Sequence, residues 1–247
     1  MKANIIMNFT DVYREESFYQ HEKFKWIDCK DIKGTNCICD NEAEKEIRQC
    51  IALYPPEGLH FIDSGNYHYI SKFWTDKINR DFVLVVFDHH TDMQPSIVEG
   101  VITCGNWVKT AIDSNPHLKR VIMIGVKDRL LKTIEEKYKK LLTIFSESAL
   151  QQIQDENNFT NIDIKEPVYI SVDKDILSEK DELLNWDQGT THISGLKKAL
   201  AFILRQSELI GIDICGECTY TIAGLIDPNM RKDNEINAQL MHFFERE

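Results

Sequence analysis

The chain has 247 residues and a formal net charge of −11, with 43% hydrophobic and 28% charged residues. This length and composition are typical of one globular α/β domain with a sizeable core, so we expect residues 1–247 to form a single domain. The acidic balance disfavours nucleic acid and anionic membrane surfaces as partners, because both require a basic face.

Neither an export signal nor a membrane span is recognisable in the sequence. The longest apolar runs are far shorter than a span, and acidic residues follow soon after the start MKANIIMNFTDVYREE. We therefore expect a cytoplasmic protein whose seven cysteines stay reduced. A zinc site formed by Cys37-x-Cys39 and Cys215-x-x-Cys218 is disfavoured, since the first pair lacks the usual two-residue spacer.

The first part of the chain gives weak structural signals up to residue 40. The run NIIMNF at 4–9 predicts an edge strand, and the stretch that continues through Cys39 indicates irregular surface structure. A helix is then predicted over 41–54, with Asn41 as its cap and Pro55-Pro56 as its end.

From residue 60 on, short apolar runs alternate with helix-like stretches. In chain order, the runs are HFID at 60–63, FVLVVFD at 82–88, RVIMIGV at 120–126, PVYISVD at 167–173 and LIGIDI at 209–214. Their nearly continuous apolar character predicts strands that are covered on both faces. The helix-like stretches are 127–140, 194–206 with Ser194 as cap, and 234–247. The alternation predicts an α/β fold, a three-layer α-β-α sandwich with a largely parallel sheet.

Two acidic clusters directly follow two of these strands: DHHTD at 88–92 and SVDKD at 171–175. The residues at alternate positions are Asp88, His90, Asp92, Asp173 and Asp175. Alternate residues of an extended chain point to the same side, so their carboxylates and the imidazole are expected together. Such a concentration of negative charge is costly to bury unless cations offset it. Because oxygen-rich sites with a few nitrogens suit Mn²⁺, the pattern predicts a two-metal hydrolase site.

Together the two clusters resemble the DAHxD and SxDxD signatures of the arginase and agmatinase family of binuclear manganese ureohydrolases. Other stretches resemble further elements of that family in the same order: SGNYHYIS at 64–71, TCGNW at 103–107, VIMIGVKD at 121–128 and LIGIDICGE at 209–217. The resemblance implies an arginase/deacetylase-like fold and two bound Mn²⁺ ions, although other divalent metals are compatible with the site.

A role for each matching residue is also implied by the resemblance. The metal ligands would be His68, Asp88, His90, Asp92, Asp173 and Asp175. One metal would have His68, Asp88, Asp92 and either Asp173 or Asp175. The other would have His90, with Asp88 and the Asp173/Asp175 pair contributing carboxylates to both metals. Asp92 would also hydrogen-bond the bridging hydroxide and pass its proton to the leaving amine. Glu217 would bind a cationic guanidinium.

His89 is a further candidate for a catalytic role. It lies between two implied ligands, so strand alternation turns it away from the metals. The alternative to a catalytic role is packing, or a hydrogen bond to a ligand.

Several departures from the family pattern indicate a divergent branch. The GGDHS element reads SGNYHY, Trp107 and Val108 stand where the family has a proton-shuttling histidine, and no Asp-Pro follows SVDKD. Gly216 occupies the slot of the family's glutamate, one residue before Glu217. Such a branch is similar to arginase-like proteins of which some hydrolyse arginine side chains inside peptides.

We therefore expect a manganese-dependent hydrolase that cleaves a C–N bond of a guanidino or amidino group. The substrate would be a small guanidino compound or an arginine-containing peptide, and an oligomer is compatible with the sequence. Two alternatives are a deacetylase-like zinc amidohydrolase and a binding or regulatory protein with a degenerate site. The deacetylase alternative needs adjacent catalytic histidines, whereas the pair His89-His90 here lies within the metal motif.

Overall fold

The computed structural model describes residues 4–20, 22–96, 98, 100–156, 163–218 and 230–245. Its centre is an eight-stranded sheet with the order β2-β1-β4-β10-β9-β5-β7-β8. Neighbouring strands run parallel throughout this sheet. The strands are β1 Asn4–Asn8, β2 Phe24–Asp28, β4 Leu59–Ile62, β5 Phe82–Phe87, β7 Leu118–Val126, β8 Leu142–Ser146, β9 Val168–Asp173 and β10 Leu209–Cys215.

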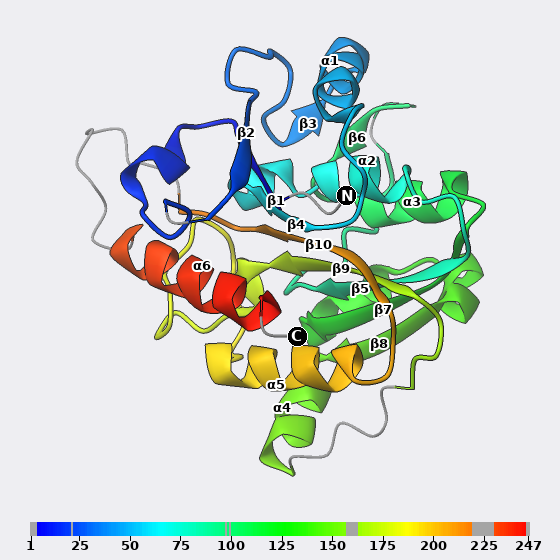
Figure 1. The fold of residues 1–247 in the computed structure, drawn as a ribbon. Helices are drawn as coiled ribbons and strands as arrows, with labels where there is room; N and C mark the ends of the chain where they lie inside the picture. Colours follow the sequence, from blue (N-terminus) through cyan, green and yellow to red (C-terminus); the bar gives the residue numbers. More distant parts are fainter. Residues whose placement is uncertain are drawn as a thin grey trace.

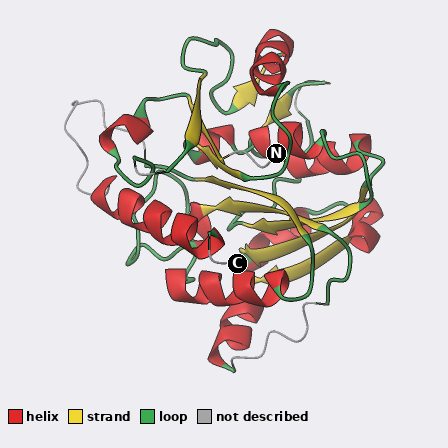
Figure 2. Cartoon of the chain, in the orientation of Figure 1, coloured by secondary structure: helices red, strands yellow, loops and turns green. Residues whose placement is uncertain are grey.

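Helices cover both faces of the sheet, with α1, α2 and α3 on one side and α4, α5 and α6 on the other (Figure 1; Figure 2). Their bounds are α1 Asn41–Ile51, α2 Ile70–Thr75, α3 Trp107–Ser114, α4 Glu147–Asp155, α5 Ile193–Leu204 and α6 Met230–Phe244. Short 3₁₀ helices are η1 Val12–Glu15, η2 Gly65–Tyr67, η3 Asp128–Thr133, η4 Glu136–Leu141 and η5 Lys174–Ile176. This arrangement confirms the predicted three-layer sandwich with a parallel sheet.

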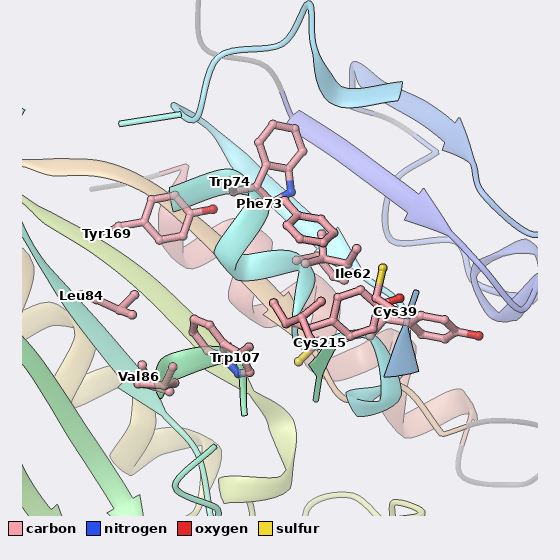
Figure 3. Close-up of a cluster of buried hydrophobic side chains, with 14 of the residues drawn as sticks. Cys39, Ile62, Phe73, Trp74, Leu84, Val86, Trp107, Tyr169 and Cys215 are labelled. Atoms are coloured by element: carbon pink, nitrogen blue, oxygen red, sulfur yellow. The ribbon is translucent and has the colours of Figure 1, made fainter. Parts of the chain in front are cut away.

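Each face of the sheet has its own apolar layer. Figure 3 shows part of the first layer, where Trp107 of α3 lies near Val86 of β5, and Phe73 of α2 lies near Ile62 of β4. The second layer contains apolar side chains of α4, α5 and α6. Because both faces are covered, the central strands are buried along their whole length, as the apolar runs predicted.

A small second sheet lies outside the main one. It pairs β3 Ile38–Cys39 with β6 Ile102–Thr103 in antiparallel fashion. This ladder joins the loop before α1 to the loop before α3. It thereby brings Cys37, Ile38, Thr103 and Cys104 next to the site described below.

Some sequence-based expectations on the elements were wrong. The strand predicted at 4–9 is not an edge strand, because β1 lies between β2 and β4. The edge strand next to β1 is β2, which lies within the stretch expected to be irregular. Only Ile27 of its side chains is buried, so its sequence shows little apolar pattern. Residues 127–140 form η3 and η4 instead of one α-helix, because Ile134 between them adopts an extended conformation.

The helix caps also differ from those predicted. Asp40, not Asn41, caps α1, and its side chain accepts hydrogen bonds from the backbone amides of Glu42 and Ala43. At α5 the N-cap is His192, which makes no side-chain capping bond, and Ser194 already lies within the helix. In the described part of the chain, no helix combines the length and apolar character that a membrane span requires.

Candidate metal centre

The six predicted metal ligands meet at the carboxyl ends of the central strands. Asp88 directly follows β5, Asp173 is the last residue of β9, and these two strands are neighbours in the sheet. His68 follows η2, in the connection after β4, and Asp175 lies in η5. Together with His90 and Asp92, these residues line one cavity of about 350 Å³. Parallel strands place such residues at one edge of a sheet, which is where ligands bind in open α/β folds.

One half of the centre is built around His68. Its Nδ1 lies 3.2 Å from Oδ2 of Asp88, 3.1 Å from Oδ2 of Asp92 and 3.4 Å from Oδ2 of Asp173. The four side chains are almost fully buried, with at most 8% exposure. An imidazole nitrogen and three carboxylate oxygens therefore converge on one point.

The other half is built around His90. Its Nδ1 lies 2.7 Å from Oδ2 of Asp175 and 3.4 Å from Oδ1 of Asp88. Asp88 thus directs one oxygen to each half, and it is the residue that the two halves share.

The donor set fits two divalent cations. In each of the groups His68–Asp88–Asp92 and Asp88–His90–Asp175, the ligand atoms lie within 4.8 Å of one another. Carboxylate oxygens with one imidazole in each group are hard donors that suit Mn²⁺ and similar metals. The carboxylates of the centre outnumber its imidazoles, so bound cations would offset repulsion that the imidazoles alone do not remove.

The pKa values of the ligands reflect this crowding. Burial, followed by repulsion from Asp175, raises the pKa of Asp173 to about 7. Burial and repulsion from Asp88 raise the pKa of Asp175 to about 6. Burial acts against charge on His90, but hydrogen bonds to Asp175 and Asp88 outweigh it and raise the pKa of His90 to about 12. Without metal, the crowding therefore makes these side chains bind protons more readily than isolated ones.

Buried hydrogen bonds to other residues of the protein orient the ligand side chains. His68 contacts the hydroxyl of Ser171 through Nε2 at 2.9 Å, and that hydroxyl donates to Asp213 at 2.6 Å. This contact turns Nδ1 of His68 toward the carboxylates. Residues 173–175 form a turn that carries two of the ligands, called the ligand turn below. Within it, the backbone amide of Asp175 donates to Oδ1 of Asp173 at 3.0 Å. Such supporting contacts fix the orientation of a metal ligand.

Asp92 is held by a tryptophan. Its backbone is in the left-handed region, with φ 48°, which aspartate tolerates better than most residues. The indole Nε1–H of Trp107 donates to Oδ2 of Asp92 inside the protein. Trp107 stands where the family resemblance expected a proton-shuttling histidine, so the carboxylate of Asp92 faces a fixed donor at that position.

The ring of His89 lies outside the cavity. It is buried, and within the described residues neither ring nitrogen has a hydrogen-bond partner. Its nearest acidic atom is Oε1 of Glu147, 3.9 Å from Nδ1. The backbone amide of His89, however, donates to Oδ1 of Asp175 at 2.9 Å, so His89 contacts the centre through its main chain.

Glu217 also lies outside the cavity lining that the structure describes. It is buried, and Nζ of Lys174 donates to its Oε2 at 2.9 Å, while Nδ2 of Asn237 donates to its Oε1 at 3.0 Å. The structure does not bring Glu217 together with the six ligands.

The cavity walls include residues that sequence reasoning missed. Trp186 is 38% exposed and makes an edge contact with the ring of His90, with centroids 6.0 Å apart. Near the small sheet formed by β3 and β6, the cavity is lined by Ile38, which is 53% exposed, and by Cys37 and Cys104. Trp186 lies in a segment without regular secondary structure, so no periodicity could have indicated it.

The cysteines do not form the zinc site that the sequence disfavoured. All seven are free. Among the described residues, no group of metal-ligating side chains combines Cys37 or Cys39 with Cys215 or Cys218.

Comparisons with known proteins identify the fold family. The family model described as "Arginase family" matches residues 5–215. A protein of Thermotoga maritima, described as "Uncharacterized protein", is 30% identical over 213 residues, which are 86% of this chain and 78% of that protein.

Solved structures show the same fold at low sequence identity. Proclavaminate amidino hydrolase from Streptomyces clavuligerus has a TM-score of 0.69 at 14% identity, covering 100% of this chain and 92% of that one. Formimidoylglutamase from Bacillus subtilis has a TM-score of 0.64 at 17% identity, with 98% and 86% covered. Arginase from Bacillus caldovelox has a TM-score of 0.62 at 14% identity, with 98% of each chain covered.

Proposed function

The chain belongs to the arginase family, and on that basis we propose that it is a binuclear manganese-dependent hydrolase that cleaves a C–N bond of a guanidino or amidino group. The observation that supports this proposal most is that five of the six ligands form two groups that share Asp88, while the sixth, Asp173, lies beside His68. His68, Asp88, Asp92 and Asp173 would hold one ion. Asp88, His90 and Asp175 would hold the other.

Two bound Mn²⁺ ions would supply a water of lowered pKa, so that hydroxide is available near neutral pH. The chain's own contribution to proton transfer is Asp92, which lines the cavity beside His68. Its carboxylate would accept the proton that the attacking water loses and would pass this proton to the leaving nitrogen. The indole of Trp107 keeps one oxygen of this carboxylate in place during that transfer.

We infer that the cavity accepts a guanidino or amidino group on a small molecule or on a peptidyl arginine. It reaches the surface at Ile38 and Trp186, which are both partly exposed, so a side chain carried by a longer ligand could enter. Hydrolase activity of solved relatives such as proclavaminate amidino hydrolase agrees with this substrate class. We assign no substrate contact to Glu217 or to the ring of His89, because neither reaches the described cavity lining.

Both alternatives to this function are disfavoured by particular residues. A deacetylase-like enzyme needs two catalytic histidines, but His90 is in the ligand group and the ring of His89 lies outside the cavity. A degenerate binding protein is expected to have lost ligands, whereas all six are present.

The function is tested by measuring urea release after reconstitution with Mn²⁺, over a panel of guanidino compounds and arginine-containing peptides. The matched control is Asp92→Asn, which keeps the shape of the side chain but removes its charge. We expect at least one substrate that the native protein hydrolyses and the variant does not. Absence of hydrolysis over the panel, with two Mn²⁺ bound, would count against a ureohydrolase activity.

A further inference from the structure

A buried lysine lies between two metal ligands. Lys174 has 0% exposure and is flanked in the chain by Asp173 and Asp175. Its Nζ lies 2.8 Å from Oε1 of Glu182 and 2.9 Å from Oε2 of Glu217. A third carboxylate, Oδ1 of Asp233, lies at 3.0 Å. The three donors of the ammonium group are therefore matched by three buried carboxylates.

The three carboxylates come from separate parts of the chain. Glu182 belongs to the segment after η5, Glu217 follows β10, and Asp233 belongs to α6. Asn237, one turn further along α6, donates to Glu217 at 3.0 Å. Thus α6 contacts Lys174 directly through Asp233 and indirectly through Asn237, which holds Glu217, although it lies outside the stretch 5–215 that matches the family model.

The chain after β10 also lies directly against the ligand turn. A Cβ atom on Gly216 would lie 2.6 Å from Oδ1 of Asp173 and 2.8 Å from the backbone nitrogen of Lys174. Gly216 has φ +101°, a conformation that other residues rarely adopt. Glycine at this position therefore lets the next residue, Glu217, reach Lys174.

A charged group buried in this way constrains the backbone that carries it. Loss of one partner leaves an uncompensated buried charge, which is strongly unfavourable, so the three contacts hold Lys174 in one place. Lys174 is the residue between Asp173 and Asp175. Holding its side chain in place therefore also fixes the directions in which the two neighbouring ligands point. Removal of the contacts that hold metal ligands in place commonly weakens metal binding about 10-fold to 100-fold.

We propose that Lys174 is a positioning residue of the metal centre, and that Asp233 makes α6 a part of that centre. This inference rests on the proposed function, since it requires that Asp173 and Asp175 bind metal. It also gives Glu217 a use: its carboxylate holds Lys174 and does not contact the substrate.

The test compares Mn²⁺ binding by Lys174→Met and Asp233→Asn with that of the native protein. Affinity and stoichiometry are measured by titration calorimetry, and electron paramagnetic resonance separates a coupled Mn²⁺ pair from a single ion. For Lys174→Met we expect binding weakened about 10-fold or more, with loss of the coupled-pair signal. For Asp233→Asn, which keeps two carboxylates on Lys174, we expect a smaller weakening in the same direction.

A control separates positioning from general stability. Ile203 of α5 is fully buried on the face of the sheet that α5 covers, and Ile203→Ala removes apolar contacts without touching the ligand turn. It should lower the melting temperature while leaving the Mn²⁺ affinity at the native value. If Lys174→Met does not fold, Asp233→Asn decides the question by the same measurement.

The outcomes are distinct for the two proposals. Native Mn²⁺ affinity and a native coupled-pair signal in folded Lys174→Met or Asp233→Asn would overturn the role of Lys174 and leave the metal centre intact. Failure of the native protein itself to bind Mn²⁺ would overturn the proposed function, and the inference with it.

Discussion

Asp88 connects the two halves of the metal centre, because its two oxygens face His68 and His90. We expect Asp88→Ala to abolish binding of both metals and all activity, since each half loses a ligand. Elemental analysis after reconstitution measures this directly. The matched control is Asp81→Ala, which removes an exposed aspartate at the opposite end of β5. Two metals per chain in Asp88→Ala would show that the ligand assignment is wrong.

Trp107 is a second residue whose effect can be isolated. Trp107→Phe keeps the aromatic packing but removes the hydrogen bond to Asp92. A hydrogen bond to a charged group contributes about 1.5–3 kcal/mol, so we expect kcat to fall about 10-fold or more with both metals retained. Trp74→Phe is the control, because the buried Nε1 of Trp74 has no hydrogen-bond partner among the described residues. Equal kcat values in the two variants would contradict the assigned role.

Metal affinity should depend on pH in a definite direction. Mn²⁺ binds the ionised carboxylates, whereas the pKa of Asp173 is raised to about 7 and that of Asp175 to about 6. Below these values a cation must displace protons, so affinity should rise from about pH 5 to about pH 8 and binding should release protons. Calorimetry in buffers of different ionisation enthalpy measures both effects. An affinity that does not change over this range would contradict the raised pKa values.

At the residue scale, the position of the two acidic clusters after apolar runs was enough to indicate the proposed ligands. Asp88 and Asp173 lie at the ends of two such strands, whereas Asp92, with φ 48°, and Asp175, in η5, reach the cavity through turns and not through the strand alternation that the sequence suggested. The partners of Lys174 could not be predicted in this way. Glu182, Glu217 and Asp233 come from three distant segments, and only the tertiary structure brings them to one point.

At the scale of the elements, prediction succeeded where burial dictates the sequence. The central strands β5 and β9 are buried on both faces and gave continuous apolar runs. The edge strand β2 has charged and exposed side chains, which protect an edge from pairing but also hide the strand from a pattern search. In the region of η3 and η4, apolar residues have helical spacing, yet the chain forms two short 3₁₀ helices, and the buried residues are Ile134 between them and Tyr138 in η4.

The cap of α1 offers a test at this scale. Asp40 accepts hydrogen bonds from two backbone amides, so Asp40→Ala should lower the free energy of unfolding by about 1 kcal/mol. Asn41→Ala serves as the control and should have little effect, because Asn41 already lies in the first turn of the helix. Urea denaturation measures the difference. A larger loss in Asn41→Ala than in Asp40→Ala would restore Asn41 as the cap.

At the scale of the whole molecule, the metals should stabilise the fold. Several buried carboxylates converge in the centre, and the cations bind the native state in preference to the unfolded one. We expect the chelated protein to melt at a lower temperature and to recover with added Mn²⁺. At a free metal concentration of 100 Kd the gain would be about 2.7 kcal/mol for each bound ion. An unchanged melting temperature after confirmed metal loss would contradict a native metal centre.

The central claim is that one chain holds two Mn²⁺ ions between the six ligands, and anomalous diffraction tests it most directly. Crystals grown with Mn²⁺ and measured on both sides of the manganese absorption edge reveal every ordered manganese position. We expect two anomalous peaks per chain, one beside His68 and Asp92 and one beside His90 and Asp175, with Asp88 in contact with both. One peak, no peak, or peaks away from these residues would contradict it.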